Sequence, residues 1–110
     1  MNPSLKRQLL KTFSQMIADL TNPKEVEDFL NDFFDEQELE KYIKRISIAY
    51  WLKKDRSIEN IKLNIKASPK EIAQVKNLLK KKGLQLAIKK IEADEWANQW
   101  AEKIQKFRKR

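Results

Sequence analysis

The side chains best suited to chemistry in this chain are lysines, an arginine and amides, gathered between Lys53 and Lys90. The chain has no His and no Cys, which removes imidazole and thiolate metal ligands, the cysteine nucleophile and the commonest general base. Its single Gly is too few for a glycine-rich phosphate loop. The sequence therefore predicts a protein that is not an enzyme and has no metal site and no cofactor.

Residues 69–82 are expected to form a helix whose polar face carries several of these side chains. Amides pair with adenine through two hydrogen bonds, and lysine reaches guanine or phosphate, so this face suits the major groove of DNA. The DNA-binding candidates on it are Ser68, Pro69, Lys70, Ala73, Gln74 and Asn77. The flanking candidates, expected at phosphates, are Lys53, Lys54, Arg56, Lys62 and Lys66.

Charge is unevenly distributed along the chain. The formal net charge is +8, yet acidic residues outnumber lysines between Leu20 and Tyr42, and basic residues dominate from Lys53 to Lys90. A basic segment of this kind favours a polyanionic partner. The acidic residues Asp35, Glu36, Glu38 and Glu40 open a helix, where negative charge is favourable.

Two helices around a short connection are predicted to present the basic segment. Ser57 can cap a helix over 58–65, and Lys66-Ala67-Ser68 connects it to the helix that begins at Pro69. Ser68 with Glu71 forms a capping box, and proline suits the first helical position. Inward positions are Ile58, Ile61 and Ile65, then Ile72, Val75, Leu78 and Leu79. This is the helix-turn-helix pattern, over 57–82.

The remaining sequence also has helical periodicity, and the predicted fold class is all-α with about six helices. The expected helices cover 5–20, 23–34, 37–54, 58–65, 69–82 and 84 onward, with Gly83 as a left-handed cap after the fifth. Two domains are predicted, 1–92 and 93–110. The second is an amphipathic helix with a basic tail, carrying Trp96, Trp100, Ile104, Phe107, Lys106, Arg108, Lys109 and Arg110.

The apolar surface exceeds what so short a chain is expected to cover, which predicts an intertwined homodimer. The residues expected at the dimer contact are Leu9, Phe13, Ile17, Ile43, Ile46, Ala49 and Tyr50. Trp51, Trp96 and Trp100 are expected in the core or at the dimer contact rather than as platforms for bases. Neither a signal peptide nor a membrane span is recognisable, so a soluble, cytoplasmic protein is expected.

The segments from Leu30 to Leu39, Arg45 to Leu52 and Ala67 to Lys76 resemble the Trp-repressor-like family, most closely the YerC/YecD branch of small bacterial regulators. The matching residues are Glu38, Leu39, Arg45, Ile48, Ala49, Leu52, Ala67, Ser68, Ile72, Val75 and Leu79. The resemblance extends over roughly 22–91. It implies a sequence-specific transcriptional regulator that binds double-stranded DNA.

Several residues depart from the family's pattern. Lys66 replaces the turn glycine, and Glu71 replaces a threonine. Members that bind tryptophan hold the indole between two arginines; Arg45 aligns with the first, Gln74 replaces the second and Val75 replaces a glycine. Tryptophan is therefore not expected as a corepressor. Arg45 is left as the one ligand-binding candidate, and also as a candidate ion-pair partner of Glu38 or Glu40.

Two other functions fit the same residues. A protein-interaction or assembly module with a degenerate helix-turn-helix is favoured by Lys66 and Glu71. A nonspecific nucleic-acid or RNA binder is favoured by the net charge. Salt-dependent binding to duplex DNA distinguishes a DNA-binding regulator from an interaction module. Comparing duplex DNA with structured RNA distinguishes the regulator from a nonspecific or RNA binder.

Overall fold

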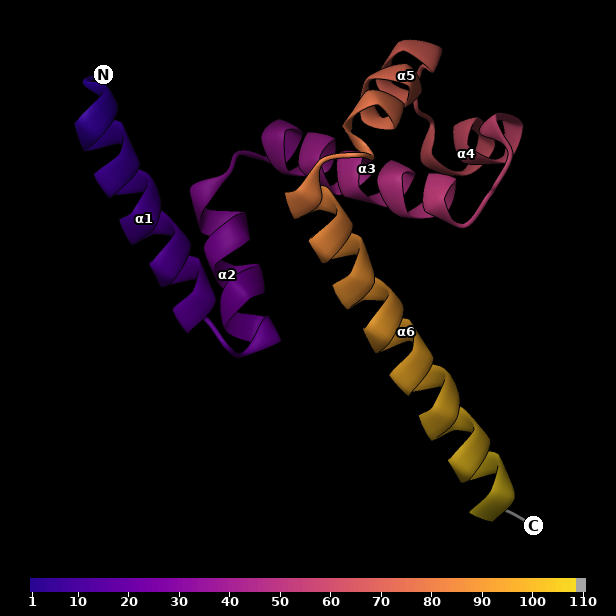
Figure 1. Cartoon of the computed structure of the whole chain (residues 1–110). Helices are drawn as coiled ribbons and strands as arrows, with labels where there is room; N and C mark the ends of the chain where they lie inside the picture. The colour runs from indigo at the N-terminus through magenta and orange to yellow at the C-terminus, as the bar shows by residue number, and fades with distance from the viewer. Residues whose placement is uncertain (109–110) are drawn as a thin grey trace. The chain divides into compact units, whose positions relative to one another are not determined.

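A computed structural model describes the backbone of residues 1–108 and the side chains of residues 1–95. Within 1–108 the chain forms six helices and no strand (Figure 1). They are α1 (Pro3–Asp19), α2 (Pro23–Phe33), α3 (Glu36–Lys53), α4 (Ile58–Ile65), α5 (Pro69–Leu78) and α6 (Lys82–Arg108). The predicted all-α class is confirmed. None of the helices described is both long and apolar enough to cross a membrane.

Polar side chains at the helix starts decide where most of the helices begin. Asn22 and Ser57 accept backbone N–H groups at the starts of α2 and α4, as predicted. α1 begins at Pro3 rather than at residue 5, because the Asn2 side chain accepts the Ser4 N–H at 2.8 Å. At α3, the Glu38 N–H donates to the Asp35 carboxylate at 2.8 Å while the Asp35 N–H donates to Glu38 at 3.1 Å.

The chain divides into two compact units, residues 1–40 and residues 41–110. In the first unit, Phe13 packs on Phe29 and Phe33 with ring centroids 6.3 and 5.9 Å apart. Even so, not one side chain among residues 1–40 is buried. The apolar residues of α1 stay open to solvent, Leu5, Leu9, Leu10, Phe13 and Ile17 being 37–60% exposed.

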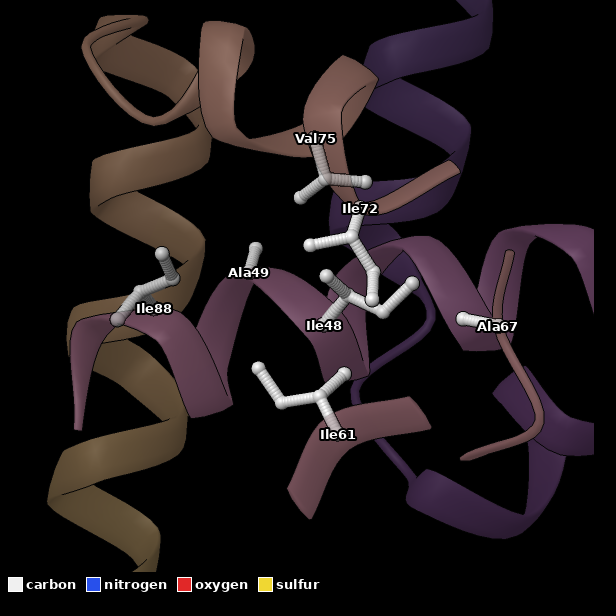
Figure 2. Packing of buried hydrophobic residues seen from close by; sticks show 7 residues of the cluster. All are labelled: Ile48, Ala49, Ile61, Ala67, Ile72, Val75 and Ile88. Carbon is white, nitrogen blue, oxygen red and sulfur yellow. The ribbon is translucent and has the colours of Figure 1, made fainter. Parts of the chain in front are cut away.

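The hydrophobic core lies in the second unit and draws on every helix there (Figure 2). Its buried residues are Ile48 and Ala49 of α3, Ile61 of α4, Ala67 of the connection, Ile72 and Val75 of α5, and Ile88 of α6. Two residues differ from the sequence prediction. Ala49 is fully buried within its own chain and offers no surface to a second copy, and Ile58, expected to face inward, is 47% exposed.

The end of α5 differs from the prediction. The helix stops at Leu78 rather than residue 82, and Gly83 lies inside α6 without a positive φ, so its predicted role as a left-handed cap is wrong. The Lys81 N–H donates to the Leu78 carbonyl at 2.9 Å, and the Gln85 N–H to the Lys81 carbonyl at 3.0 Å. Leu79 and Leu84 both pack against the core, which requires the chain to turn between them.

The C-terminal part of the sequence prediction stays a prediction. The side chains of Trp96, Trp100, Ile104, Phe107 and the basic tail lie outside the described residues, although the α6 backbone continues to Arg108. The division into domains 1–92 and 93–110 is untested for the same reason.

Candidate nucleic-acid interface

The connection between α4 and α5 has the sharp turn that a helix-turn-helix requires. Lys66 ends α4 in the left-handed region, with φ 58° and ψ 40°, and its N–H donates to the Lys62 carbonyl at 3.0 Å. This is the conformation that glycine adopts most easily. Ala67 follows and is buried between the helices (Figure 2). Lys66 therefore forms the turn at the position where the family's pattern has a glycine.

The start of α5 is fixed by the predicted capping box. The Glu71 N–H donates to the Ser68 hydroxyl at 3.1 Å, and the Ser68 N–H donates to a Glu71 carboxylate oxygen at 3.2 Å. That backbone hydrogen bond from Ser68 is the main reason why the pKa of Glu71 is lowered, with smaller contributions from the Ser68 side chain and the charges of Lys44 and Lys41. Glu71 is thus an ionised cap of its own helix.

The polar face of α5 gathers the base-reading candidates. Lys70, Ala73, Gln74 and Asn77 are all exposed, and their three- and four-residue spacing places them on one side of the helix. Ile72 and Val75 face the core from the opposite side. Ser68 and Pro69, also exposed, lie at the N-terminal end of this face. All six predicted residues of the helix are therefore accessible.

The flanking cations come from the end of α3, the α3–α4 turn and α4. Two of them lie over aromatic rings: Lys54 Nζ is 5.6 Å from the centre of Tyr50, and the Arg56 guanidinium carbon is 4.2 Å from that of Trp51. Lys62 is half-buried and Lys66 exposed. Lys53 instead lines a cavity of about 700 Å³ with residues of α6, among them Lys89 and Glu92.

A second cavity, of about 540 Å³, lies between α3 and α5. It is lined by Lys41, Arg45, Ile48, Glu71, Gln74, Val75, Asn77 and Leu78. The Arg45 guanidinium lies 5.6 Å from the centre of the Tyr42 ring. The structure thus brings the ligand candidate Arg45 together with Gln74 and Val75 in one cavity.

Sequence reasoning missed the aromatic platforms of the two cations and the part that Lys41 plays in the second cavity. The four-residue spacing of Tyr50 and Lys54, and of Lys41 and Arg45, could have revealed both pairs. Trp51 and Arg56 are five residues apart, across a helix end. Only the backbone conformation of that end brings their side chains together.

Comparison with known proteins points to one family. The sequence model of the family described as "Trp repressor protein" matches residues 8–91, which is well over half of the chain and includes α4, the connection and α5. Searches of characterised proteins and of solved structures returned no match.

Proposed function

The chain belongs to the Trp repressor family of helix-turn-helix DNA-binding regulators, and we propose that it is a sequence-specific transcriptional regulator. On this proposal α5 enters the major groove and presents Lys70, Gln74 and Asn77 to base edges. The cations Lys54, Arg56, Lys62 and Lys66 contact phosphates. Members of the family are regulators rather than enzymes.

The observation that carries this proposal is the geometry of the helix-turn-helix itself. The alternative of an assembly module rested on Lys66 and Glu71 as departures from the family's pattern. Lys66 nevertheless forms the left-handed turn, and Glu71 caps α5 through Ser68. Because Lys66 adopts the turn conformation and Glu71 caps the helix that follows, neither is a reason to regard the helix-turn-helix as degenerate.

The match identifies the family but no branch within it. We propose two finer assignments. We place the chain in the YerC/YecD branch on the residue pattern between Leu30 and Lys76. We also place it in the cytoplasm, since a regulator of a bacterial chromosome works where that DNA lies.

We further propose that the protein acts as a homodimer. The apolar stripe of α1 is exposed, and the unit of residues 1–40 has no buried side chain of its own. Ile43, at 54% exposure, adds to the uncovered apolar surface. In a symmetric dimer the two α5 helices would reach successive major grooves about 34 Å apart.

The first prediction separates base contacts from phosphate contacts. Gln74→Ala should reduce the preference for a selected duplex over a scrambled one by about 1–3 kcal/mol, because a bidentate contact to a base is lost. Lys62→Ala should weaken both duplexes equally and reduce the slope of log affinity against log salt by about one. The measurement is duplex binding across a salt series, after selection from random DNA.

Lys11→Ala, an exposed lysine of α1, is the matched control for lost charge and should change neither quantity. If neither Gln74→Ala nor Lys62→Ala affects duplex binding, this face does not touch DNA. The assembly module then replaces the DNA-binding regulator as the proposed function. Equal binding to structured RNA and to scrambled duplex would support the nonspecific binder instead.

The second prediction concerns the cavity between α3 and α5. Free tryptophan should not bind there as a corepressor, because the side chains of Gln74 and Val75 stand where the family's tryptophan-binding members have an arginine and a glycine. Calorimetry with tryptophan should show no heat of specific binding, and tryptophan should leave duplex affinity unchanged. Binding at micromolar concentration would refute this.

A further inference from the structure

The end of α3 holds Arg56 in a defined place by a backbone motif. The Arg56 N–H donates to the Trp51 carbonyl and the Asp55 N–H to the Leu52 carbonyl, both at 3.1 Å. Asp55 lies in the left-handed region with φ 59°. These features define a Schellman motif, in which the residue after the left-handed position lies beside the third residue from the helix end. Here those two residues are Arg56 and Trp51.

In a Schellman motif, the side chains at these two positions frequently make a hydrophobic contact. In this protein the contact is between the Arg56 guanidinium and the Trp51 indole. The Arg56 guanidinium carbon lies 4.2 Å from the centre of the Trp51 ring, well within the range of a cation–π interaction. Trp51 itself is half-buried and packs against the core. The arginine therefore rests on a platform that is part of the folded interior.

A second contact holds the guanidinium from the side of α4. Arg56 Nη1 donates to the Asn60 amide oxygen at 3.4 Å, across the first turn of α4. This acceptor is a neutral amide, so the hydrogen bond does not neutralise the guanidinium. Stacking uses the face of the guanidinium and leaves its remaining N–H donors in the plane of the group, where a phosphate binds. Arg56 is also exposed.

The charge surroundings of Arg56 are mixed, and they favour an anion on balance. Lys53 and Lys54 precede it, and α4 begins directly after it, with the positive end of its dipole at Ser57. Asp55 and Glu59 are the carboxylates closest to it in sequence. In a helix-turn-helix, the first helix crosses the DNA backbone, so the end of α4 next to Arg56 is where a phosphate is expected.

We propose that Trp51 is a positioning residue for DNA binding: it preorganises Arg56 as a phosphate contact at the start of the helix-turn-helix. The proposal rests on the proposed function and adds to it a residue that does not itself touch DNA. Holding the guanidinium in place before binding removes part of the entropy cost of immobilising a long side chain at the interface. Trp51 thus contributes to affinity through Arg56 alone.

The test is a double-mutant cycle in the full-length protein, with duplex affinity measured across a salt series. Arg56→Ala should weaken binding to every duplex several-fold and reduce the salt slope by about one. Trp51→Leu should weaken binding about two- to fivefold, the value of an exposed cation–π contact, and leave the salt slope unchanged because the charge remains. In the Arg56→Ala background, Trp51→Leu should have no further effect.

Two further variants separate positioning from a general structural role. Trp51→Phe keeps an aromatic face and should restore most of the affinity that Trp51→Leu loses. In a Trp96→Phe/Trp100→Phe background, Trp51 is the only tryptophan, since the chain has three. Its emission should change when duplex is added, and this change should be lost with Arg56→Ala. Urea unfolding of each variant verifies that it is folded.

The proposal and its premise fail in different ways. If the unmodified protein binds no duplex, the proposed function and this inference are both overturned. If it binds duplex but Trp51→Leu weakens binding equally with and without Arg56, or in neither background, only the inference is overturned.

Discussion

Lys66 shows how one residue can adopt a conformation for which its side chain is poorly suited. Its φ of 58° and ψ of 40° lie in the left-handed region, which costs a residue with a Cβ roughly 1–2 kcal/mol. Two buried neighbours, Ile61 and Ala67, fix the helices on either side of the turn. The free energy gained by packing the core therefore offsets the local strain at Lys66, so the turn forms without a glycine.

Lys66→Gly should stabilise the fold. Glycine relieves the left-handed strain but gives the unfolded chain more freedom, worth about 0.4–1 kcal/mol, so the net gain expected is about 0.5 kcal/mol. Urea unfolding at constant protein concentration measures it. Lys62→Gly, inside α4, is the matched control and should destabilise by about 1 kcal/mol. A loss of stability in Lys66→Gly would mean that its side chain makes a contact more valuable than the strain.

Individual site residues could be predicted from the sequence to differing extents. Gln74 and Asn77 were found because helical spacing alone places them opposite Ile72 and Val75. The cation–π contact of Arg56 was not, since it depends on a left-handed Asp55 that the sequence pattern does not specify. Spacing thus identifies contacts within a helix, whereas contacts across a helix end depend on the conformation of the turn.

At the scale of helices, the starts were easier to predict than the ends. Asn22, Ser57 and Ser68 cap helices as expected, because a short polar side chain directly before a helix can accept the N–H groups of its first turn, which have no partner within the helix. The end of α5 was predicted from Gly83 and was wrong. Helix ends respond to tertiary packing, here the need for both Leu79 and Leu84 to reach the core.

The capping box of α5 should make the stability of the folded protein depend on pH. Since the pKa of Glu71 is lower in the folded protein than its ordinary value, its stabilising contribution is present above the unfolded-state pKa of about 4.3. This contribution is lost as pH falls through the lowered folded pKa. Asp35, whose pKa is lowered chiefly by the Glu38 N–H, adds a dependence of the same sign at α3.

Glu71→Gln should therefore be less stable than the unmodified protein at pH 7, and the two should become equal once pH has fallen below the lowered folded pKa of Glu71. Ser68→Ala, which removes the other half of the box, should cost about 1 kcal/mol at neutral pH. Thermal unfolding at a series of pH values measures both. Glu71→Gln should also bind any duplex more tightly, because a negative charge beside the phosphates is removed; unchanged duplex affinity would place Glu71 away from the DNA.

At the scale of the whole molecule, the two units differ in how completely they are folded around apolar side chains. Residues 41–95 enclose Ile48, Ala49, Ile61 and the rest of the core, whereas the side chains of residues 1–40 are at most partly buried. Two helices alone seldom remove enough apolar surface from water to be stable. In the proposed dimer, the same apolar stripe of a second copy would cover α1, and each contact would occur twice because of the two-fold symmetry.

Leu9→Gln/Ile17→Gln should accordingly dissociate the proposed dimer without changing net charge. Leu9 and Ile17 are 48% and 43% exposed, so covering each recovers about half of the 1.5–3 kcal/mol of full burial. Two residues in two copies then amount to roughly 4 kcal/mol, and the dimer dissociation constant should rise at least about a hundredfold. Sedimentation and light scattering measure it. Leu63→Gln, an exposed leucine of α4, is the control and should leave the dimer intact.

The double variant should also lose most of its affinity for a palindromic duplex while a single half-site is bound as before, because avidity requires two linked α5 helices. A monomeric unmodified protein at micromolar concentration, or a double variant that still dimerises, would show that α1 is covered by something other than a second copy.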